Sequence, residues 1–361
     1  MNTQSPALFS PFKLRELTLQ NRIVVSPMCQ YSAQDGCAQD WHLMHIGNLC
    51  SGKSGMVIIE MTNVSAVGRI TPNCLGLYND ETQAALQKVV SFCKTQTDSP
   101  IAVQLAHAGR KASTLPPWTG RASLAIDQGG WQPLAPSDVD FGDNDNLPRA
   151  MTLDEIAQLK TDFVNSTKRA NEIGFDAIEV HAAHGYLLHQ FLSPLTNLRD
   201  DQYGGSLENR MRLPLEIFAA MREVWPEEKP MGVRISATDW VDQGWDLSQS
   251  EVFAKELDKL NCDWLDVSSG GLHPKQRITT GPGYQLPFAE AIKKHIDMPI
   301  MSVGEITQAQ QANQIIQNGQ ADLVAIGRAM LYNPRWTWHA ATELNVDLTY
   351  PNQYLRCRPA N

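Results

Sequence analysis

The 361-residue sequence has no run of about 18 apolar residues, the length that a membrane-spanning helix needs. Residues 1–8 are neutral and polar, so they lack the basic start and the apolar stretch of a signal peptide. The net charge is −9, and Lys and Arg form no cluster of the kind that binds a phosphate backbone. We therefore expect a soluble protein with no membrane or nucleic-acid partner.

Paired cysteines are also missing. The seven cysteines are scattered, form no C-x-x-C pair and are odd in number. This pattern indicates free thiols in a reducing compartment, and it lacks the spacing of a zinc or iron–sulfur site. Charged residues make up only 19% of the chain and hydrophobic residues 42%, which argues against disorder and supplies a large core. The sequence therefore predicts a cytoplasmic globular protein.

Short apolar runs recur along the chain, with segments of helical spacing between them. They lie at residues 22–26, 56–61, 101–105, 177–181, 231–236, 264–268, 299–303 and 323–326. Continuous apolar strands are typical of a parallel sheet that is covered on both faces. Eight such strands alternating with helices predict an α/β protein with a (β/α)8 TIM barrel, and a doubly wound open sheet is the alternative.

Capping residues mark the ends of several predicted helices. Thr152 and Glu155 have the spacing of a capping box, and Gly174 is a typical stop for the helix that follows. Ser248 and Thr307 begin two further segments with the same spacing, so we expect helices to start there as well.

The length alone, at about 150 residues per domain, suggests two domains. However, the third and fourth predicted strands start at residues 101 and 177, and much of the long interval is rich in Pro, Gly and Asp. We interpret this excursion, at about residues 106–150, as part of a substrate lid over the barrel. The sequence thus predicts one barrel domain over residues 1–361, with a C-terminal tail at about 345–361.

In a TIM barrel the chemistry occurs at the C-terminal ends of the strands. The loops after the seventh and eighth strands form a phosphate site in many barrels, and here they contain Gly304 and the pair Gly327-Arg328. Arginine suits phosphate because its guanidinium group donates several hydrogen bonds. A phosphate-bearing ligand is therefore expected, although these glycines would also serve as tight turns. The other residues at or near these strand ends are Ser26, Pro27, Met28, Cys29, Tyr31, Gln104, His181, His184, Tyr186 and Arg234.

His181 and His184 could share a metal ion, but there is no third ligand cluster and no H-E-x-x-H pattern. We therefore expect no metal, and we interpret the pair as hydrogen-bonding ligands of a substrate, with core histidines as the alternative. Tyr186 follows closely at the barrel mouth, where a phenol could donate a proton or could merely pack.

The stretch 193–206, SPLTNLRDDQYGGS, followed by Asn209-Arg210, resembles the old yellow enzyme family of flavin-dependent ene reductases. The resemblance extends from Phe9 through Arg356. The motifs SPMCQY at 26–31 and HAGRK at 107–111, together with the pair of histidines, resemble the subgroup that carries a cysteine beside the flavin. Xenobiotic reductases belong to that subgroup.

The resemblance implies a non-covalently bound FMN and NADPH or NADH as the reductant. The residues that would bind FMN are Ser26, Pro27, Met28, Cys29, Met61, Gln104, Arg234, Gly304, Gly327 and Arg328. Those that would bind substrate are Tyr31, His181, His184, Tyr186 and Arg356. Met61 departs from the subgroup, which usually has a small residue at this position.

The implied reaction is the reduction of the C=C bond of α,β-unsaturated carbonyl compounds by a ping-pong mechanism. Hydride would pass from reduced FMN to Cβ, and Tyr186 would give a proton to Cα. The alternative substrates are nitro compounds or nitrate esters. The resemblance also implies a homodimer or homotetramer in which Arg356 reaches the neighbouring active site.

Three competing readings are weaker. A flavin-independent lyase or isomerase could use the phosphate site with Tyr186 as an acid, and a flavin-binding protein without turnover could use the same cofactor residues. Relatives of dienoyl-CoA reductase share the barrel but carry an iron–sulfur cysteine cluster and further domains.

Overall fold

Eight parallel strands form a closed barrel at the centre of the computed structural model, which describes residues 6–142 and 145–358. Around the barrel the order is β10-β11-β12-β3-β4-β5-β8-β9. The strands are β3 (Ile23–Val25), β4 (Met56–Asn63), β5 (Ile101–Ala106), β8 (Ala177–Ala182), β9 (Met231–Ser236), β10 (Leu265–Ser268), β11 (Ile300–Ser302) and β12 (Leu323–Ile326). The predicted TIM barrel is confirmed, and each predicted strand ends within two residues of the observed one.

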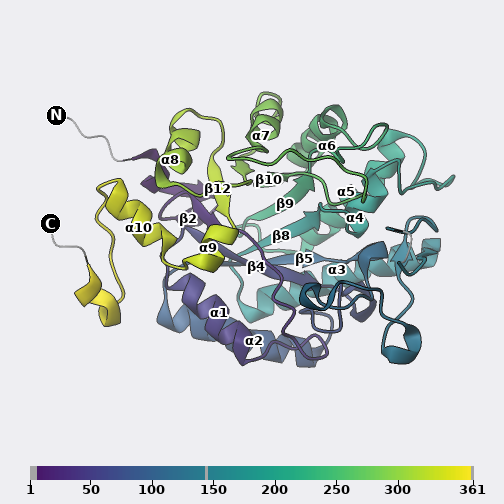
Figure 1. Cartoon of the computed structure of the whole chain (residues 1–361), viewed down its shortest axis with the longest axis horizontal. Helices are drawn as coiled ribbons and strands as arrows, with labels where there is room; N and C mark the ends of the chain where they lie inside the picture. The colour runs from purple at the N-terminus through teal and green to yellow at the C-terminus, as the bar shows by residue number, and fades with distance from the viewer. Residues whose placement is uncertain (1–5, 143–144, 359–361) are drawn as a thin grey trace.

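Helices surround the barrel because the outward faces of its strands are apolar, and all eight residues of β4 are buried. In the view of Figure 1, α1 and α2 lie below the strands and α6, α7 and α8 lie above them. The helices are α1 (Asp40–Cys50), α2 (Asp80–Gln96), α3 (Leu153–Ile173), α4 (Leu187–Leu192), α5 (Leu207–Val224), α6 (Leu247–Lys259), α7 (Leu286–Lys293), α8 (Ala309–Gln317), α9 (Arg328–Tyr332) and α10 (Trp336–Glu343).

The cap predicted for α3 is confirmed. The Thr152 side chain accepts a hydrogen bond from the Glu155 N–H, and the Glu155 carboxylate accepts one from the Thr152 N–H. Gly174 ends the helix at φ +95°, a conformation that favours glycine.

The caps predicted at Ser248 and Thr307 are wrong. Asp246 caps α6 instead, because its carboxylate accepts from the Gln249 N–H and suits the positive end of the helix dipole. Ser248 lies in the first turn and donates its hydroxyl to Asp246. Thr307 lies before α8, where its N–H donates to the Gln311 side chain.

A short antiparallel hairpin, β1 (Phe12–Leu14) and β2 (Leu17–Leu19), packs against the N-terminal end of the barrel. Leu14 and Leu19 share a buried cluster with Trp264 inside the barrel. The sequence reading missed this hairpin, since its two-residue turn contains Arg15 at φ +49° and no Gly or Asn to signal it. The hairpin thus covers the N-terminal end of the barrel and leaves the C-terminal ends of the strands open for a ligand site.

The excursion between β5 and α3 lies against the loops at that open end. Its segments are η3 (Gly109–Lys111), η4 (Pro117–Thr119), η5 (Ile126–Gln128) and the strand pair β6 (Leu134–Ala135) and β7 (Arg149–Ala150). Lys111 donates to the carbonyls of His184 and Gly271, and the Trp131 indole donates to the Val67 carbonyl. These bonds tie the excursion to the loops that follow β4, β8 and β10.

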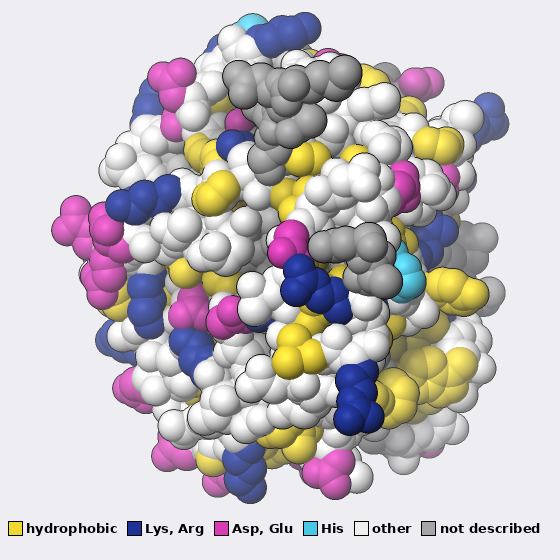
Figure 2. Space-filling model, turned by 90° about the vertical axis from the view of Figure 1, so that its left-hand side faces the viewer, with side chains coloured by type: hydrophobic (Ala, Val, Ile, Leu, Met, Phe, Trp, Pro, Cys, Tyr) yellow, Lys and Arg dark blue, Asp and Glu magenta, His cyan; other side chains and the backbone are white. Residues whose placement is uncertain are grey.

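The chain after α10 packs back on that helix, where the Tyr350 and Trp338 rings lie 4.8 Å apart, and it ends in η6 (Asn352–Cys357). On the side of the molecule that Figure 2 presents, basic and acidic side chains are interspersed. Among the described residues, no helix combines the length and apolar character that crossing a membrane requires.

Candidate active site

A cavity of about 760 Å³ opens at the C-terminal ends of the barrel strands. This volume is in the usual range for small-molecule sites. Of the residues predicted from the sequence, Ser26, Met28, Arg234, Gly304, Gly327 and Arg328 line it. The other lining residues, which the sequence reading did not name as site residues, include Ser268, Tyr284, Gln285, Glu305 and Tyr332. The cavity therefore unites the predicted phosphate loops with residues near the barrel axis.

The loops after β11 and β12 form the outer end of the cavity. Gly304 has φ +126°, which only glycine adopts readily. The N–H groups of Gly327 and Arg328 make no hydrogen bond to any residue that the structure describes. The Arg328 side chain is 81% exposed, and its Nη2 lies 3.3 Å from Oε1 of Glu305. Free N–H groups beside an accessible guanidinium suit a phosphate.

Arg234 and Gln104 are buried at the inner end of the barrel mouth, and each is held by a buried acid. Nε of Arg234 lies 3.1 Å from Oδ2 of Asp266, and its Nη1 donates to the Ser26 hydroxyl at 3.1 Å. The Gln104 amide donates to Oε1 of Glu179 at 2.8 Å. The sequence reading missed both acids, although an acidic residue inside an otherwise apolar strand was a visible signal.

His181, His184 and Tyr186 come together at the end of β8. The His181 ring centroid lies 5.1 Å from those of both His184 and Tyr186. Nδ1 of His184 lies 3.4 Å from Nε2 of His181, and its Nε2 lies 2.8 Å from the Ser268 hydroxyl. His184 at φ +57° and Gly185 at φ +72° turn the chain so that it presents all three rings. The predicted grouping is therefore present.

Burial lowers the pKa of both imidazoles well below the usual value, and the positive charge of Arg234 lowers each pKa further. The two histidines are therefore neutral at pH 7. Burial raises the pKa of the Tyr186 phenol well above its usual value, so this group keeps its proton. The site thus combines two neutral imidazoles with a protonated phenol.

Cys29, Tyr31 and Met61 belong with Tyr186 to one apolar cluster at the mouth. Burial raises the pKa of the Cys29 thiol, and the nearby Glu60 carboxylate raises it further, so the group is a thiol at neutral pH. The excursion adds Trp118, whose ring lies 5.8 Å from that of Tyr31 and which the sequence reading did not single out.

The predicted residues that do not line the cavity are Pro27, Cys29, Tyr31, Met61, Gln104, His181, His184, Tyr186 and Arg356. Pro27 is partly buried beside Ser26. Arg356 lies on η6 in the exposed tail, and no hydrogen bond or ion pair joins its side chain to the described part of the chain.

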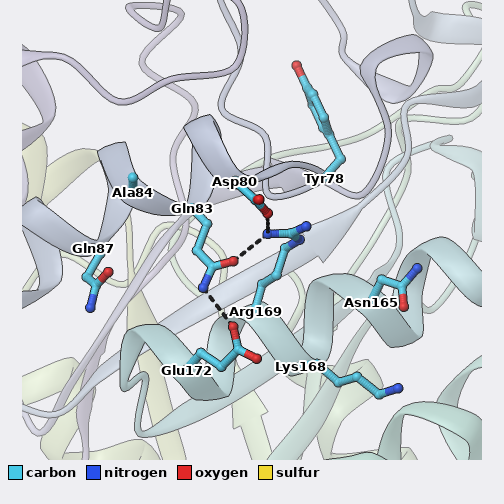
Figure 3. Close-up of a pocket in the computed structure, with 9 residues that line it drawn as sticks. All are labelled: Tyr78, Asp80, Gln83, Ala84, Gln87, Asn165, Lys168, Arg169 and Glu172. Carbon is cyan, nitrogen blue, oxygen red and sulfur yellow. Dashed lines mark hydrogen bonds and ion pairs between the residues drawn. The ribbon is translucent and has the colours of Figure 1, made fainter.

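A second hollow, of about 550 Å³, lies between α2 and α3 and contains none of the predicted residues. Figure 3 shows that four of its polar side chains, those of Asp80, Gln83, Arg169 and Glu172, bond to one another. Arg169 bonds to Asp80 at 2.7 Å and to Gln83, and Gln83 donates to Glu172 at 2.8 Å. The barrel mouth is therefore the better candidate for chemistry.

The residues at the mouth fit the FMN that the resemblance implies. The loops after β11 and β12 offer free N–H groups and an arginine for a phosphate, and the inner end offers a guanidinium and an amide. Nδ1 of His181 is buried with no partner among the residues described, so a polar ligand atom can still pair with it. Residues 6–142 and 145–358 contain no group of three or more His, Cys, Asp or Glu side chains that could hold a metal ion.

Comparisons with known proteins agree with this geometry. Residues 7–347 match the NADH:flavin oxidoreductase / NADH oxidase family. An NADPH dehydrogenase of Bacillus cytotoxicus is 45% identical over 99% of this chain and 97% of its own length. The NADPH dehydrogenase of Bacillus subtilis is 41% identical over 97% of this chain and 98% of its own.

Solved structures show the same likeness. Morphinone reductase matches with a TM-score of 0.79 and 28% identity, over 98% of this chain and 93% of its own. A 2-naphthoyl-CoA reductase shares the fold, with a TM-score of 0.85 at 22% identity, and this chain spans only about half (52%) of it. The chain therefore belongs to the NADH:flavin oxidoreductase / NADH oxidase family, the old yellow enzyme family, and is an oxidoreductase that uses FMN with a nicotinamide reductant.

Proposed function

We propose that the enzyme is an ene reductase, which reduces the C=C bond of α,β-unsaturated carbonyl compounds in a ping-pong cycle. The observation that carries this proposal is the grouping of two neutral imidazoles and one protonated phenol at the end of β8. FMN, when bound at the mouth, would accept hydride from NAD(P)H and supply hydride to Cβ of the substrate. Protein side chains would bind the carbonyl oxygen and supply the proton.

His181 and His184 would bind the substrate's carbonyl oxygen. Negative charge develops on this oxygen as hydride reaches Cβ, and preorganised N–H donors stabilise that charge. A neutral imidazole has one N–H donor, and Nδ1 of His181 is buried without a partner among the residues described. The positive charge of Arg234, which favours the neutral form of both rings, also attracts the developing anion.

Tyr186 would give the proton to Cα. Its raised pKa keeps the phenol protonated until the reaction requires the proton. The Lys111 Nζ lies 5.0 Å from the centre of the tyrosine ring, and burial lowers the pKa of this amine to about 7. At neutral pH the protonated fraction of Lys111 would stabilise the phenolate that remains after the proton has left.

The remaining mouth residues would hold the cofactor. The whole chain would form the single barrel domain that contains this site. Gly304, Gly327 and Arg328 would bind the FMN phosphate, and Gln104 and Arg234 would contact the flavin ring. Ser26, Met28, Cys29 and Met61 would line the ring together with Pro27, the chain neighbour of Ser26, and Tyr31 would line the substrate space.

We also propose a homodimer or homotetramer in which Arg356 reaches the neighbouring active site. The support is local: the arginine projects from η6 without a partner in the described chain, and Tyr354 and Leu355 beside it are 43% and 53% exposed. An exposed tail with apolar residues next to an unpaired cation can bind a second copy of the chain.

The test is the visible spectrum of the purified protein. A flavin band should be present, should bleach with anaerobic NADPH and should recover on addition of 2-cyclohexenone. Recovery with a nitrate ester but not with the enone would favour nitro compounds or nitrate esters as substrates. A colourless protein that fails to bind FMN would overturn the proposal.

A further inference from the structure

Glu179 lies inside the barrel, level with Gln104 at the inner end of the mouth. It is fully buried on β8, in register with Gln104 on β5 and Gly232 on β9. Gly232 leaves room for the Trp264 indole, because a Cβ atom there would lie 2.1 Å from that ring. The indole N–H donates to Oε2 of Glu179 at 3.3 Å.

The other oxygen of Glu179 contacts a predicted flavin-binding residue. Oε1 accepts the hydrogen bond from Nε2 of Gln104. Because the amide nitrogen is engaged there, the amide oxygen of Gln104 is its free acceptor, and no described residue donates to that oxygen. An N–H group of a ligand can therefore bond to it. The carboxyl group of Glu179 thus determines the orientation of an amide that would face the flavin.

Three ionisable groups from three strands share this interior. They are Glu179 on β8, Arg234 on β9 and Asp266 on β10. The pKa of Glu179 is raised to about 8, by burial first and by the negative charge of Asp266 second, against the opposing positive charge of Arg234. At neutral pH the charges of Asp266 and Arg234 offset each other and Glu179 carries a proton. His181, the next inward-facing residue on β8, is neutral.

We propose that Glu179 is a positioning residue of the flavin site, which orients the Gln104 amide and controls, by gaining or losing a proton, the positive field of Arg234 at the cofactor. The inference rests on the proposed placement of FMN against Gln104 and Arg234. When Glu179 loses its proton, its negative charge offsets part of the arginine's field. Reduced flavin is more electron-rich than oxidised flavin, so the weaker positive field stabilises the reduced form less. The midpoint potential of the flavin therefore falls more steeply with pH.

The test measures the midpoint potential of bound FMN from pH 6.5 to 9.5 by spectroelectrochemistry, in the wild type and in Glu179→Gln. Both proteins are uncharged at residue 179 at pH 6.5, so their potentials should agree there. Above about pH 8 the wild-type potential should fall below that of the variant, and the variant should lack the inflection. Glu155→Gln, the same change on the surface, should follow the wild-type curve. Identical curves for the wild type and Glu179→Gln would overturn the proposal.

A second variant covers the case in which Glu179→Gln does not fold. Trp264→Phe removes the indole donor to Glu179 and keeps the carboxyl group, so the inflection should move to higher pH. An inflection that stays in place would contradict the proposal.

Arg234→Gln distinguishes a wrong FMN site from a wrong role of Glu179. An unchanged FMN potential in this variant would place the flavin elsewhere and would overturn the proposed site together with the role of Glu179. A lowered potential in Arg234→Gln, with Glu179→Gln behaving as the wild type, would overturn only the role of Glu179.

Discussion

Nε2 of His189 lies 2.9 Å from Oδ1 of Asp239, and both side chains are fully buried behind the turn that presents His184 and Tyr186. On its other side, Nδ1 of His189 accepts the N–H of Gly185, in the middle of that turn. Asp239 also accepts hydrogen bonds from the Ser193 hydroxyl and the Trp245 N–H. The pair therefore connects the left-handed turn after β8 to the loop after β9. The sequence reading missed it.

Asp239→Asn should loosen this turn. The amide has one acceptor oxygen where the carboxylate has two, so a buried donor loses its partner, at a cost of about 1–3 kcal/mol. Urea unfolding should report the loss of stability, and enone reduction should slow more than flavin reduction, because only the former needs Tyr186 in place. Asp242→Asn, an exposed change in the same loop, is the matched control. Wild-type stability and rates in Asp239→Asn would contradict the positioning role.

Tyr186→Phe should slow the oxidative half-reaction with 2-cyclohexenone by roughly 10²- to 10⁴-fold, the usual contribution of a positioned proton donor. Reduction of the flavin by NADPH should continue at the wild-type rate, because no proton from this residue is needed. Stopped-flow absorbance separates the two steps. Tyr78→Phe, remote from the mouth on the way to α2, serves as the control. Equal slowing of both steps would argue against a proton donor.

Stability should decrease as the pH falls from 6.5 towards 4. Burial lowers the pKa of His45 and His107 to about 4, and it also lowers the pKa values of His181 and His184. The unfolded chain therefore takes up protons that the folded chain excludes, and this favours unfolding below the unfolded pKa of about 6.5.

The histidine at position 107 offers a specific test of this pH dependence. Its Nδ1 accepts the Gly109 N–H, a bond that protonation would break. His107→Gln should remove about 2 kcal/mol of the stability lost between pH 7.5 and 4.5, as measured by urea unfolding with excess FMN. His339→Gln, on an exposed histidine, should keep the full loss. An unchanged pH dependence in His107→Gln would refute the assignment.

Arg356→Ala should raise the Michaelis constant for the enone severalfold if the tail completes a neighbouring active site. Arg358→Ala changes a second exposed arginine of the same tail, which pairs with Asp347, and should leave the constant unchanged. Sedimentation velocity on both variants shows whether the oligomer has also been lost. The proposal fails if Arg356→Ala keeps both the wild-type constant and the wild-type oligomer.

Much of the fold could be predicted because parallel strands covered on both faces are continuous apolar runs, a local signal. Ser248 and Thr307 were misassigned as caps because capping depends on which of several nearby acceptors the chain geometry brings to the first turn. The hairpin at 12–19 escaped notice because Arg15 takes the positive φ that Gly or Asn usually signals.

Eight continuous apolar runs in one chain were enough to predict the barrel. The candidate residues could be predicted because the C-terminal ends of parallel strands must meet. The features missing from the sequence, namely apolar spans, basic clusters and cysteine pairs, narrowed the classes of protein to consider. The buried groups that act on those residues can be identified only from the folded chain. Glu179 reaches Gln104 across 75 positions of the chain, and Asp239 reaches His189 across 50. Such pairs depend on the distance between residues in three dimensions and on the low dielectric constant of the interior, which strengthens the interaction between charges. Neither property can be derived from a local sequence pattern.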